Sequence, residues 1–134
     1  MNCNVTWAPP AWDEAYSRKH RKVSGRSKKM WERSTLAAST ASGNDSVYNP
    51  NLTRNDIEAI EMECVRRAIA VPAAHNELQL TICHVRRFYV KLGNLIGASE
   101  GIKTDYILVQ YENDGSVHGW PVTEKYLKLQ GVVL

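Results

Sequence analysis

The strongest hydrophobic pattern in the chain lies between residues 54 and 70. Its apolar side chains recur at the three- and four-residue spacing of an amphipathic helix: Ile57, Ile60, Cys64, Val65, Ala68 and Ile69. Thr53 stands where a helix N-cap is expected, with Asp56 three residues further on, and Pro72 ends the pattern. The sequence therefore predicts a helix over residues 54–70.

Residues 76–92 carry a pattern that fits either a helix or a pair of strands. In the helical interpretation one face collects the apolar side chains Leu78, Ile82, Val85, Tyr89 and Leu92. Asn76 would cap that helix and Gly93 would end it. In the other interpretation, apolar and polar residues alternate in both halves, as they do in strands. The cap and the glycine favour a helix for the first half, whereas residues 88–96 also suit a strand.

A β-hairpin is predicted over residues 103–122. Residues 103–112 have the composition of a strand, Asp114 and Gly115 form a turn, and residues 116–122 return. The length of the turn decides which side chains face each other across the hairpin.

A two-residue turn places Tyr111 opposite His118 and Val109 opposite Trp120. A three-residue turn that includes Asn113 shifts every pair by one position, and both registers fit the sequence.

The C-terminal residues complete the predicted fold. Pro121 puts the return strand at an edge or near its end, because proline has no amide to donate. Residues 123–128 predict a short helical turn that Gly131 ends, and residues 132–134 are a candidate addition to the sheet. Together these patterns predict an α+β domain over residues 47–134, with one or two N-terminal helices followed by a small antiparallel sheet.

Residues 1–46 lack such a pattern, which indicates a basic, poorly structured arm and linker in front of the domain. A proline pair at residues 9–10 stops regular structure early, and residues 17–29 hold one aliphatic side chain in thirteen. Such a segment buries too little apolar surface to offset its ordering entropy. Residues 36–46 are small and polar, as in a linker, so we place the domain boundary near Val47.

Charge is distributed unevenly between the arm and the domain. The first 35 of the 134 residues contain eight Lys or Arg against three Asp or Glu, a net of +5, and the rest have a net of −2. A basic segment on a near-neutral body indicates a polyanionic partner, most often nucleic acid. A solvated tail, or contact with an anionic membrane or protein, is the alternative. The predicted nucleic-acid-binding residues, tryptophans included as stacking platforms, are Arg18, Lys19, Arg21, Lys22, Arg26, Lys28, Lys29, Trp31 and Trp120.

Other features narrow the class of protein. Cys3, Cys64 and Cys83 are odd in number and widely spaced, which predicts no disulfide framework and a reducing compartment. The chain has no run of about 18 apolar residues and no classical signal peptide, so we expect no membrane span and a cytoplasmic site of action. It has no metal-ligand or dinucleotide-loop spacing, so we expect no metal and no cofactor.

Two histidine clusters are candidates for chemistry. If residues 84–91 are helical, His84, Arg87 and Lys91 share a side, with Arg86 adjacent. An imidazole beside guanidinium groups suits metal-free phosphodiester cleavage, because the imidazole moves protons and the cations hold the phosphate charge. The alternative is a solvated basic face.

The second cluster surrounds His118 on the hairpin. Tyr111 lies opposite it in one register, and Tyr106 is a further hydroxyl able to orient a phosphate. Gly119 removes a side chain beside the imidazole, which would let a ligand approach, and Trp120 would stack a base. The alternative is a sheet histidine hydrogen-bonded to Tyr111 beside a core tryptophan.

A helix leading into an antiparallel sheet, with a histidine on a late strand, resembles small metal-independent ribonuclease domains of the barnase and colicin-ribonuclease kind. The resemblance covers residues 53–134 at the level of the fold, and no diagnostic motif accompanies it. It implies an RNA target in the cytosol, a dedicated inhibitor (immunity) protein, and delivery as part of a secreted bacterial toxin.

The sequence thus predicts an RNA-directed protein, a small metal-independent ribonuclease of toxin type. His118 would act as general acid or base, and Arg86 and Arg87 would hold phosphate. Tyr111 or Tyr106 would assist. The alternative is a non-catalytic module that docks its basic arm on nucleic acid, within a nucleoprotein or phage assembly. An intracellular adaptor with no nucleic-acid role is a third hypothesis.

Overall fold

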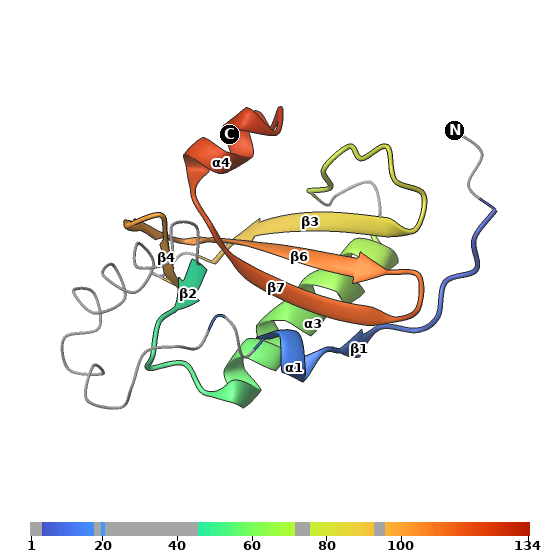
Figure 1. The fold of residues 1–134 in the computed structure, drawn as a ribbon, viewed down its shortest axis with the longest axis horizontal. Helices are drawn as coiled ribbons and strands as arrows, with labels where there is room; N and C mark the ends of the chain where they lie inside the picture. Colours follow the sequence, from blue (N-terminus) through green and yellow to red (C-terminus); the bar gives the residue numbers. More distant parts are fainter. Residues whose placement is uncertain (1–3, 18–19, 21–45, 72–75, 93–95) are drawn as a thin grey trace.

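The computed structural model of this protein describes residues 4–17, 20, 46–71, 76–92 and 96–134. These residues form helices and largely antiparallel sheets, which confirms the predicted α+β class (Figure 1). In chain order the elements are β1 (Ala11–Trp12), α1 (Glu14–Ser17), β2 (Ser46–Tyr48), α3 (Arg54–Ala70), β3 (Val85–Lys91), β4 (Gly97–Ser99), β5 (Ile102–Thr104), β6 (Tyr106–Glu112), β7 (Ser116–Val122) and α4 (Glu124–Leu129).

Two sheets organise the fold. The larger has the strand order β1-β7-β6-β3 and is antiparallel except for β1, which runs parallel to β7. The smaller has the order β2-β4-β5 and lies beside one end of the larger sheet (Figure 1). The predicted strand over residues 103–112 is therefore divided at Asp105 between β5 and β6, which belong to different sheets.

The predicted helix over residues 54–70 is confirmed as α3. The Thr53 hydroxyl accepts a hydrogen bond from the Asp56 amide, and the Asp56 carboxylate accepts one from the Thr53 amide. This reciprocal capping box satisfies two amides that a helix N-terminus otherwise leaves without partners. Its buried side faces the sheet and carries Ile57, Glu61, Met62, Val65 and Ala68.

The helix favoured for the first half of residues 76–92 is wrong. The chain is extended there, with a bridge between Glu77 and Phe88, and only β3 is regular. The Leu78 amide donates to the Arg87 carbonyl, and Leu78 is buried beneath α4. Pairing with β3 therefore overrides the local helical signal, as expected for a short apolar segment beside a sheet edge.

The β6–β7 hairpin has the three-residue register. Gln110 pairs with His118 and Leu108 pairs with Trp120, so the alternative turn that includes Asn113 is confirmed. The two-residue-turn pairs, Tyr111 with His118 and Val109 with Trp120, are wrong. Gly115 has φ +102°, a left-handed conformation that closes the longer turn at little cost for glycine.

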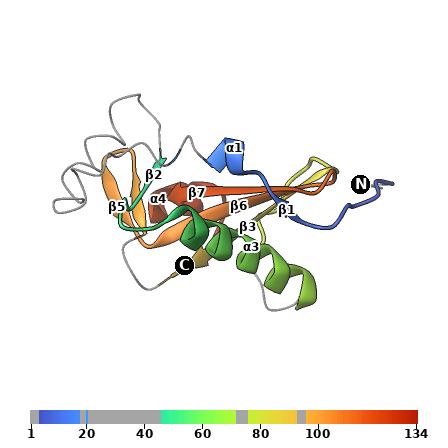
Figure 2. The same ribbon diagram turned by 90° about the horizontal axis from the view of Figure 1, so that it is seen from below.

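The large sheet has two differently covered faces. On the α3 face, Phe88, Val109 and Val117 form one core cluster with residues of α3. We call the opposite side the far face. There Leu108 and Val122 form a second cluster with Leu127 of α4, and α1 lies on that side as well (Figure 2). Alternate residues along each strand therefore belong to different environments.

The C-terminus ends as a helix and a turn. The predicted helical turn is confirmed as α4, capped by the Thr123 hydroxyl, and Gly131 follows at φ +89°. Residues 132–134 form no strand, contrary to the expectation, because the Val132 amide donates to the Leu127 carbonyl and folds the chain back on α4.

The described part of the predicted arm packs on the domain. Within residues 4–17, Ala8 donates its amide to the Asn113 carbonyl, β1 pairs with β7, and Trp7 and Trp12 pack against the core. The predicted nucleic-acid-binding residues of the arm lie outside the described residues: Arg18, Lys19, Arg21, Lys22, Arg26, Lys28, Lys29 and Trp31.

Candidate functional site

A polar row crosses the far face of the large sheet. Arg87 of β3 and His118 of β7 flank Gln110 of β6 in the strand register. The Arg87 Nε donates to Gln110 Oε1 at 2.8 Å, and Gln110 Nε2 donates to Glu112 Oε1 at 3.1 Å. Directly opposed residues on neighbouring strands share a face, so the sheet holds these side chains together on a rigid support.

Aromatic rings gather around this row. The Tyr16 ring of α1 stacks on His118, with centroids 3.7 Å apart and planes inclined by 26°. Trp120 lies 5.7 Å from His118 and 6.1 Å from His20, and the Arg87 guanidinium is 5.7 Å from the Trp120 ring. We call these five residues, Tyr16, His20, Arg87, His118 and Trp120, the imidazole cluster. It joins two imidazoles, a phenol, an indole and a guanidinium.

The two histidines of the cluster differ in their surroundings. His118 is only 3% exposed, because α1 lies over it. His20 places Nδ1 at 2.7 Å from the Ser46 carbonyl oxygen. A carbonyl oxygen only accepts, so Nδ1 carries the hydrogen and Nε2 is the basic nitrogen of the neutral ring.

The four predicted catalytic residues are divided between the two faces. His118 and Arg87 lie together on the far face, whereas Arg86 and Tyr111 lie on the α3 face. Arg86 makes two hydrogen bonds of 3.0 Å to Glu77, which raise the pKa of its guanidinium. Neighbouring residues of one strand point to opposite sides, so a one-residue shift of register separates Tyr111 from His118.

Tyr111 has a structural environment. It is buried in the core of the α3 face, where its hydroxyl donates to the Ala8 carbonyl and its ring lies 4.9 Å from Trp7. Burial raises the pKa of this phenol. Tyr106 is also buried, beside Leu127 under α4. Neither hydroxyl belongs to the imidazole cluster.

Gly119 and His84 also lie differently from their predicted roles. A Cβ on Gly119 would lie 2.8 Å from the Leu108 carbonyl oxygen and 3.1 Å from Glu61 Oε2. The glycine therefore makes room for a buried glutamate rather than for a ligand. His84 is exposed in the turn before β3, not on a helix with Arg87.

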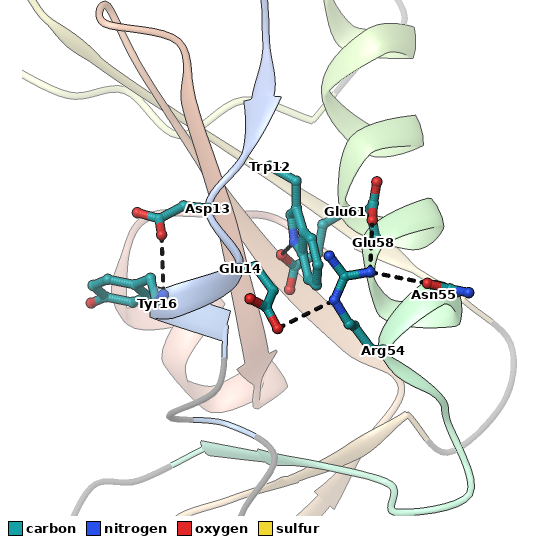
Figure 3. Close-up of polar contacts among 8 residues, drawn as sticks. All are labelled: Trp12, Asp13, Glu14, Tyr16, Arg54, Asn55, Glu58 and Glu61. Carbon is teal, nitrogen blue, oxygen red and sulfur yellow. Dashed lines mark hydrogen bonds and ion pairs between the residues drawn. The ribbon is translucent and has the colours of Figure 1, made fainter.

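Glu61 is the most buried charged group described, with 0% exposure, and it is a polar centre that was not predicted from the sequence. Trp12 Nε1 donates to its Oε1 at 2.8 Å (Figure 3). The Tyr48 hydroxyl donates to its Oε2 at 2.5 Å. Burial and the neighbouring Glu61 raise the pKa of Tyr48 well above its usual range. A signal was present, because Glu61 falls between Ile57 and Val65 on the apolar stripe of the helix.

Arg54 ties the N-terminal segment to α3 (Figure 3). It forms ion pairs with Glu14 of α1 at 3.2 Å and with Glu58 at 3.6 Å, and it bonds Asn55 at 3.1 Å. Its guanidinium also lies 4.9 Å from the Trp12 ring. Residues 12–16 thus reach α3 on one side of the sheet edge and the imidazole cluster on the other.

Cys83 is disulfide-bonded, which the wide spacing of the cysteines did not predict. Cys64 is free, and burial followed by the charge of Glu61 raises its pKa to about 12. Widely spaced cysteines give no local sign of pairing, because a disulfide depends on separation in space.

Two pockets open away from the imidazole cluster. One of about 660 Å³ lies between α3 and β3 and is lined by Ile60, Cys64, Arg67, Phe88 and Val90 among others. The other, of about 290 Å³, lies near the start of α4 beside Lys91 and Lys103. Neither pocket is lined by a histidine, so the candidate catalytic residues lie on the face of the sheet and not in these pockets.

In the described ranges, no group of three or more His, Cys, Asp or Glu side chains is placed to hold a metal ion. No described helix is both long and apolar enough to cross a membrane. The sequence and fold of this chain match no known family model, no curated protein and no solved structure.

Proposed function

We propose that this protein is a metal-independent endoribonuclease whose catalytic centre is the imidazole cluster. The observation that carries the proposal is the convergence of His118, Arg87 and Trp120 on one face of the sheet. Two of the four residues selected from sequence for catalysis belong to this cluster. Imidazole and guanidinium supply the proton transfer and the charge stabilisation that phosphodiester cleavage without a metal needs, and the indole offers a surface on which a base stacks.

The reaction is a transfer of the phosphoryl group within one RNA strand. A neutral imidazole of the cluster takes the proton of a ribose 2′-hydroxyl, and the 2′-oxygen attacks the adjacent phosphorus. The bond to the 5′-oxygen breaks, and that oxygen takes a proton from an acid of the site. The products are a 2′,3′-cyclic phosphate and a 5′-hydroxyl end. Arg87 balances the negative charge of the pentacoordinate phosphate, and His118 moves the proton.

The basic residues of the arm would supply affinity for the RNA backbone. His20 and Ser46, which lie at the two ends of this segment in the chain, are in contact through the His20 Nδ1 bond. Six Lys and Arg residues lie between them in the sequence. Phosphate neutralisation by these cations would make binding fall steeply with salt.

The resemblance to toxin ribonucleases extends the proposal to partners and location. On that basis the target is cytosolic RNA, the protein is delivered as part of a secreted toxin, and the producing cell holds an inhibitor (immunity) protein. Unhindered growth of bacteria that express the protein without an inhibitor would contradict this part of the proposal.

A non-catalytic nucleic-acid-binding module is the second candidate. The observation that favours it is the 3% exposure of His118, since a residue that only supports a binding surface does not need to reach the solvent. Arg87 already bonded to Gln110 fits the same role.

Cleavage assays separate the two candidates. Total RNA is incubated in chelator with the wild type, His118→Ala and Arg87→Ala. We expect cleavage to cyclic phosphate ends, reduced by roughly 10²–10⁴-fold in His118→Ala, the usual contribution of a proton-transfer group. In Arg87→Ala we expect a loss of about 10²–10³-fold, the usual cost of removing one group that stabilises transition-state charge. His84→Ala is the matched control, because this exposed histidine lies outside the cluster. RNA that stays intact but migrates more slowly, with a steep salt dependence, would indicate the non-catalytic binding module. No interaction with RNA at all would leave the hypothesis of an adaptor without a nucleic-acid role.

A further inference from the structure

The contact between Tyr16 and His118 bears on how RNA would reach the site. A histidine that is 3% exposed cannot touch a substrate while the ring above it stays in place. On the basis of the proposed function, we infer that the position of the Tyr16 ring is the binding site of an RNA base. The base displaces α1 and stacks on His118 in its stead.

The surroundings of Tyr16 match those of a bound base. The ring lies 3.7 Å from His118 with planes inclined by 26°, the geometry of aromatic stacking. Trp120 is 6.5 Å from the same ring, and the Arg87 guanidinium lies against Trp120 at 5.7 Å. Imidazole, indole and guanidinium planes are the surfaces on which proteins stack nucleobases. The Tyr16 ring therefore occupies, within the protein itself, the position that a nucleobase would take.

The attachment of α1 permits this exchange. The helix is a single turn, which has little stability of its own. Its ion pair to Arg54 joins side chains that are 47% and 33% exposed, and solvent screens such pairs. Displacing Tyr16 also exchanges one ring stack on His118 for another, so the stacking lost is regained.

The residues just before α1 are held more firmly. Trp12 bonds buried Glu61, and β1 is paired with β7 through Ala11 and Trp12. The Asp13 amide continues this pairing, since it donates to the Val117 carbonyl at 2.8 Å. The point of release therefore lies after Asp13, at Glu14. The rest of the N-terminal segment stays in place when α1 moves.

This arrangement also defines the substrate class. A base inside a duplex has both faces covered by its neighbours and cannot enter a stack on a protein ring without leaving the helix. The site therefore takes an unpaired base of single-stranded RNA, and a duplex of the same sequence binds more weakly.

The test removes Tyr16 and measures two quantities that do not depend on cleavage. The first is the rate at which diethyl pyrocarbonate acylates His118, read by peptide mass mapping. The second is the affinity for a single-stranded oligonucleotide with 2′-O-methyl riboses, whose 2′-oxygens cannot attack. In Tyr16→Ala we expect both to rise by about tenfold, which is in the range of one lost stacking contact. Tyr126→Ala is the matched control, since it truncates a half-buried tyrosine of α4.

Glu14→Gln provides a second variant that keeps the aromatic ring. It removes the ion pair to Arg54 and should raise both quantities in the same direction by a smaller factor. This variant decides the outcome if Tyr16→Ala does not fold.

The outcomes separate the inference from the proposed function. Faster acylation with tighter binding supports the base site, whether or not the wild type cleaves RNA. If Tyr16→Ala leaves the acylation rate and the affinity unchanged, and the wild type cleaves RNA through His118, the base site alone is overturned. Weaker binding by Tyr16→Ala also overturns it, because Tyr16 would then be part of the binding surface and not its occupant.

Discussion

At the scale of single residues, one buried carboxylate organises the side of the domain opposite the imidazole cluster. Glu61 receives hydrogen bonds from Trp12 and Tyr48, and its carboxyl group lies against Gly119. A buried charge is tolerated only where hydrogen bonds replace its water. The surroundings of Glu61 come from three separate parts of the chain. Trp12 and Tyr48 supply the hydrogen-bond donors, and Gly119 leaves the space for the carboxyl group.

The free thiol next to Glu61 gives a residue-scale prediction. Burial, and then the charge of Glu61, raises the pKa of Cys64 to about 12. Only the thiolate is alkylated, so the reaction of Cys64 with iodoacetamide should be slow at pH 8 and should accelerate by about tenfold per pH unit up to pH 10. Peptide mapping measures the rate, and Cys64→Ser is the control. A rate that levels off near pH 9 would contradict the raised pKa.

At the scale of elements, the helices follow local signals closely. Capping hydroxyls start both α3 and α4, at Thr53 and Thr123, and Gly131 follows α4. The strands depend on partners instead. β3 forms because β6 and the bridge at Glu77 satisfy its backbone groups on both sides. Caps act within one turn of helix, whereas strand pairing joins distant segments, and this separates the elements predicted correctly from those predicted wrongly.

The capping box of α3 makes stability depend on pH. Hydrogen bonds from Thr53 lower the pKa of Asp56 in the folded protein. A lowered carboxyl pKa stabilises the fold above the ordinary carboxyl pKa, and this contribution is lost as the pH falls through the lowered value. Asp56→Ala should therefore reduce the free energy of unfolding at pH 7 and matter little at strongly acid pH. Urea unfolding at both pH values measures this.

Glu63→Ala is the matched control for the cap. This exposed acid lies in the middle of the same helix and caps nothing. If the two variants lose equal stability at pH 7, or if the loss in Asp56→Ala is independent of pH, the capping box does not contribute as described.

At the scale of the whole molecule, the N-terminal segment completes one edge of the large sheet and covers part of it. β1 adds the strand at the β7 edge, Trp7 and Trp12 cover part of the core, and α1 lies on the far face (Figure 2). Residues that precede the boundary suggested by composition therefore pack on the sheet and its core.

Trp12→Phe tests whether this segment stabilises the fold. The phenyl ring keeps most of the packing but removes the Nε1 donor to Glu61, which should lower the free energy of unfolding by about 1–3 kcal/mol. Trp7→Phe is the matched control, because its ring packs on Tyr111. Chemical denaturation measures both variants, and equal losses would show that the bond to Glu61 adds nothing.

The candidate site was predictable in part. His118, Arg87 and Trp120 were selected from residue type and position, and they lie in one cluster. Tyr111 and Arg86 were selected by the same reasoning and lie on the other face. Tyr111 lies there because the turn is one residue longer than the simpler assumption. Arg86 lies there because it is the neighbour of Arg87 on a strand, where successive side chains point to opposite faces. Tyr16 and His20 were missed, since nothing in a basic N-terminal segment indicates which sheet residue it will cover.

The sequence by itself determined the α+β class, the limits of α3, the position of the hairpin turn and the short final helix. These depend on interactions between residues a few positions apart, where side-chain chemistry decides the backbone conformation. Tertiary structure alone decided the hairpin register, the course of residues 76–84, the environment of Glu61 and the cover over His118. Each of these is set by contacts between segments distant in the chain, and neither spacing nor composition encodes which distant segments meet.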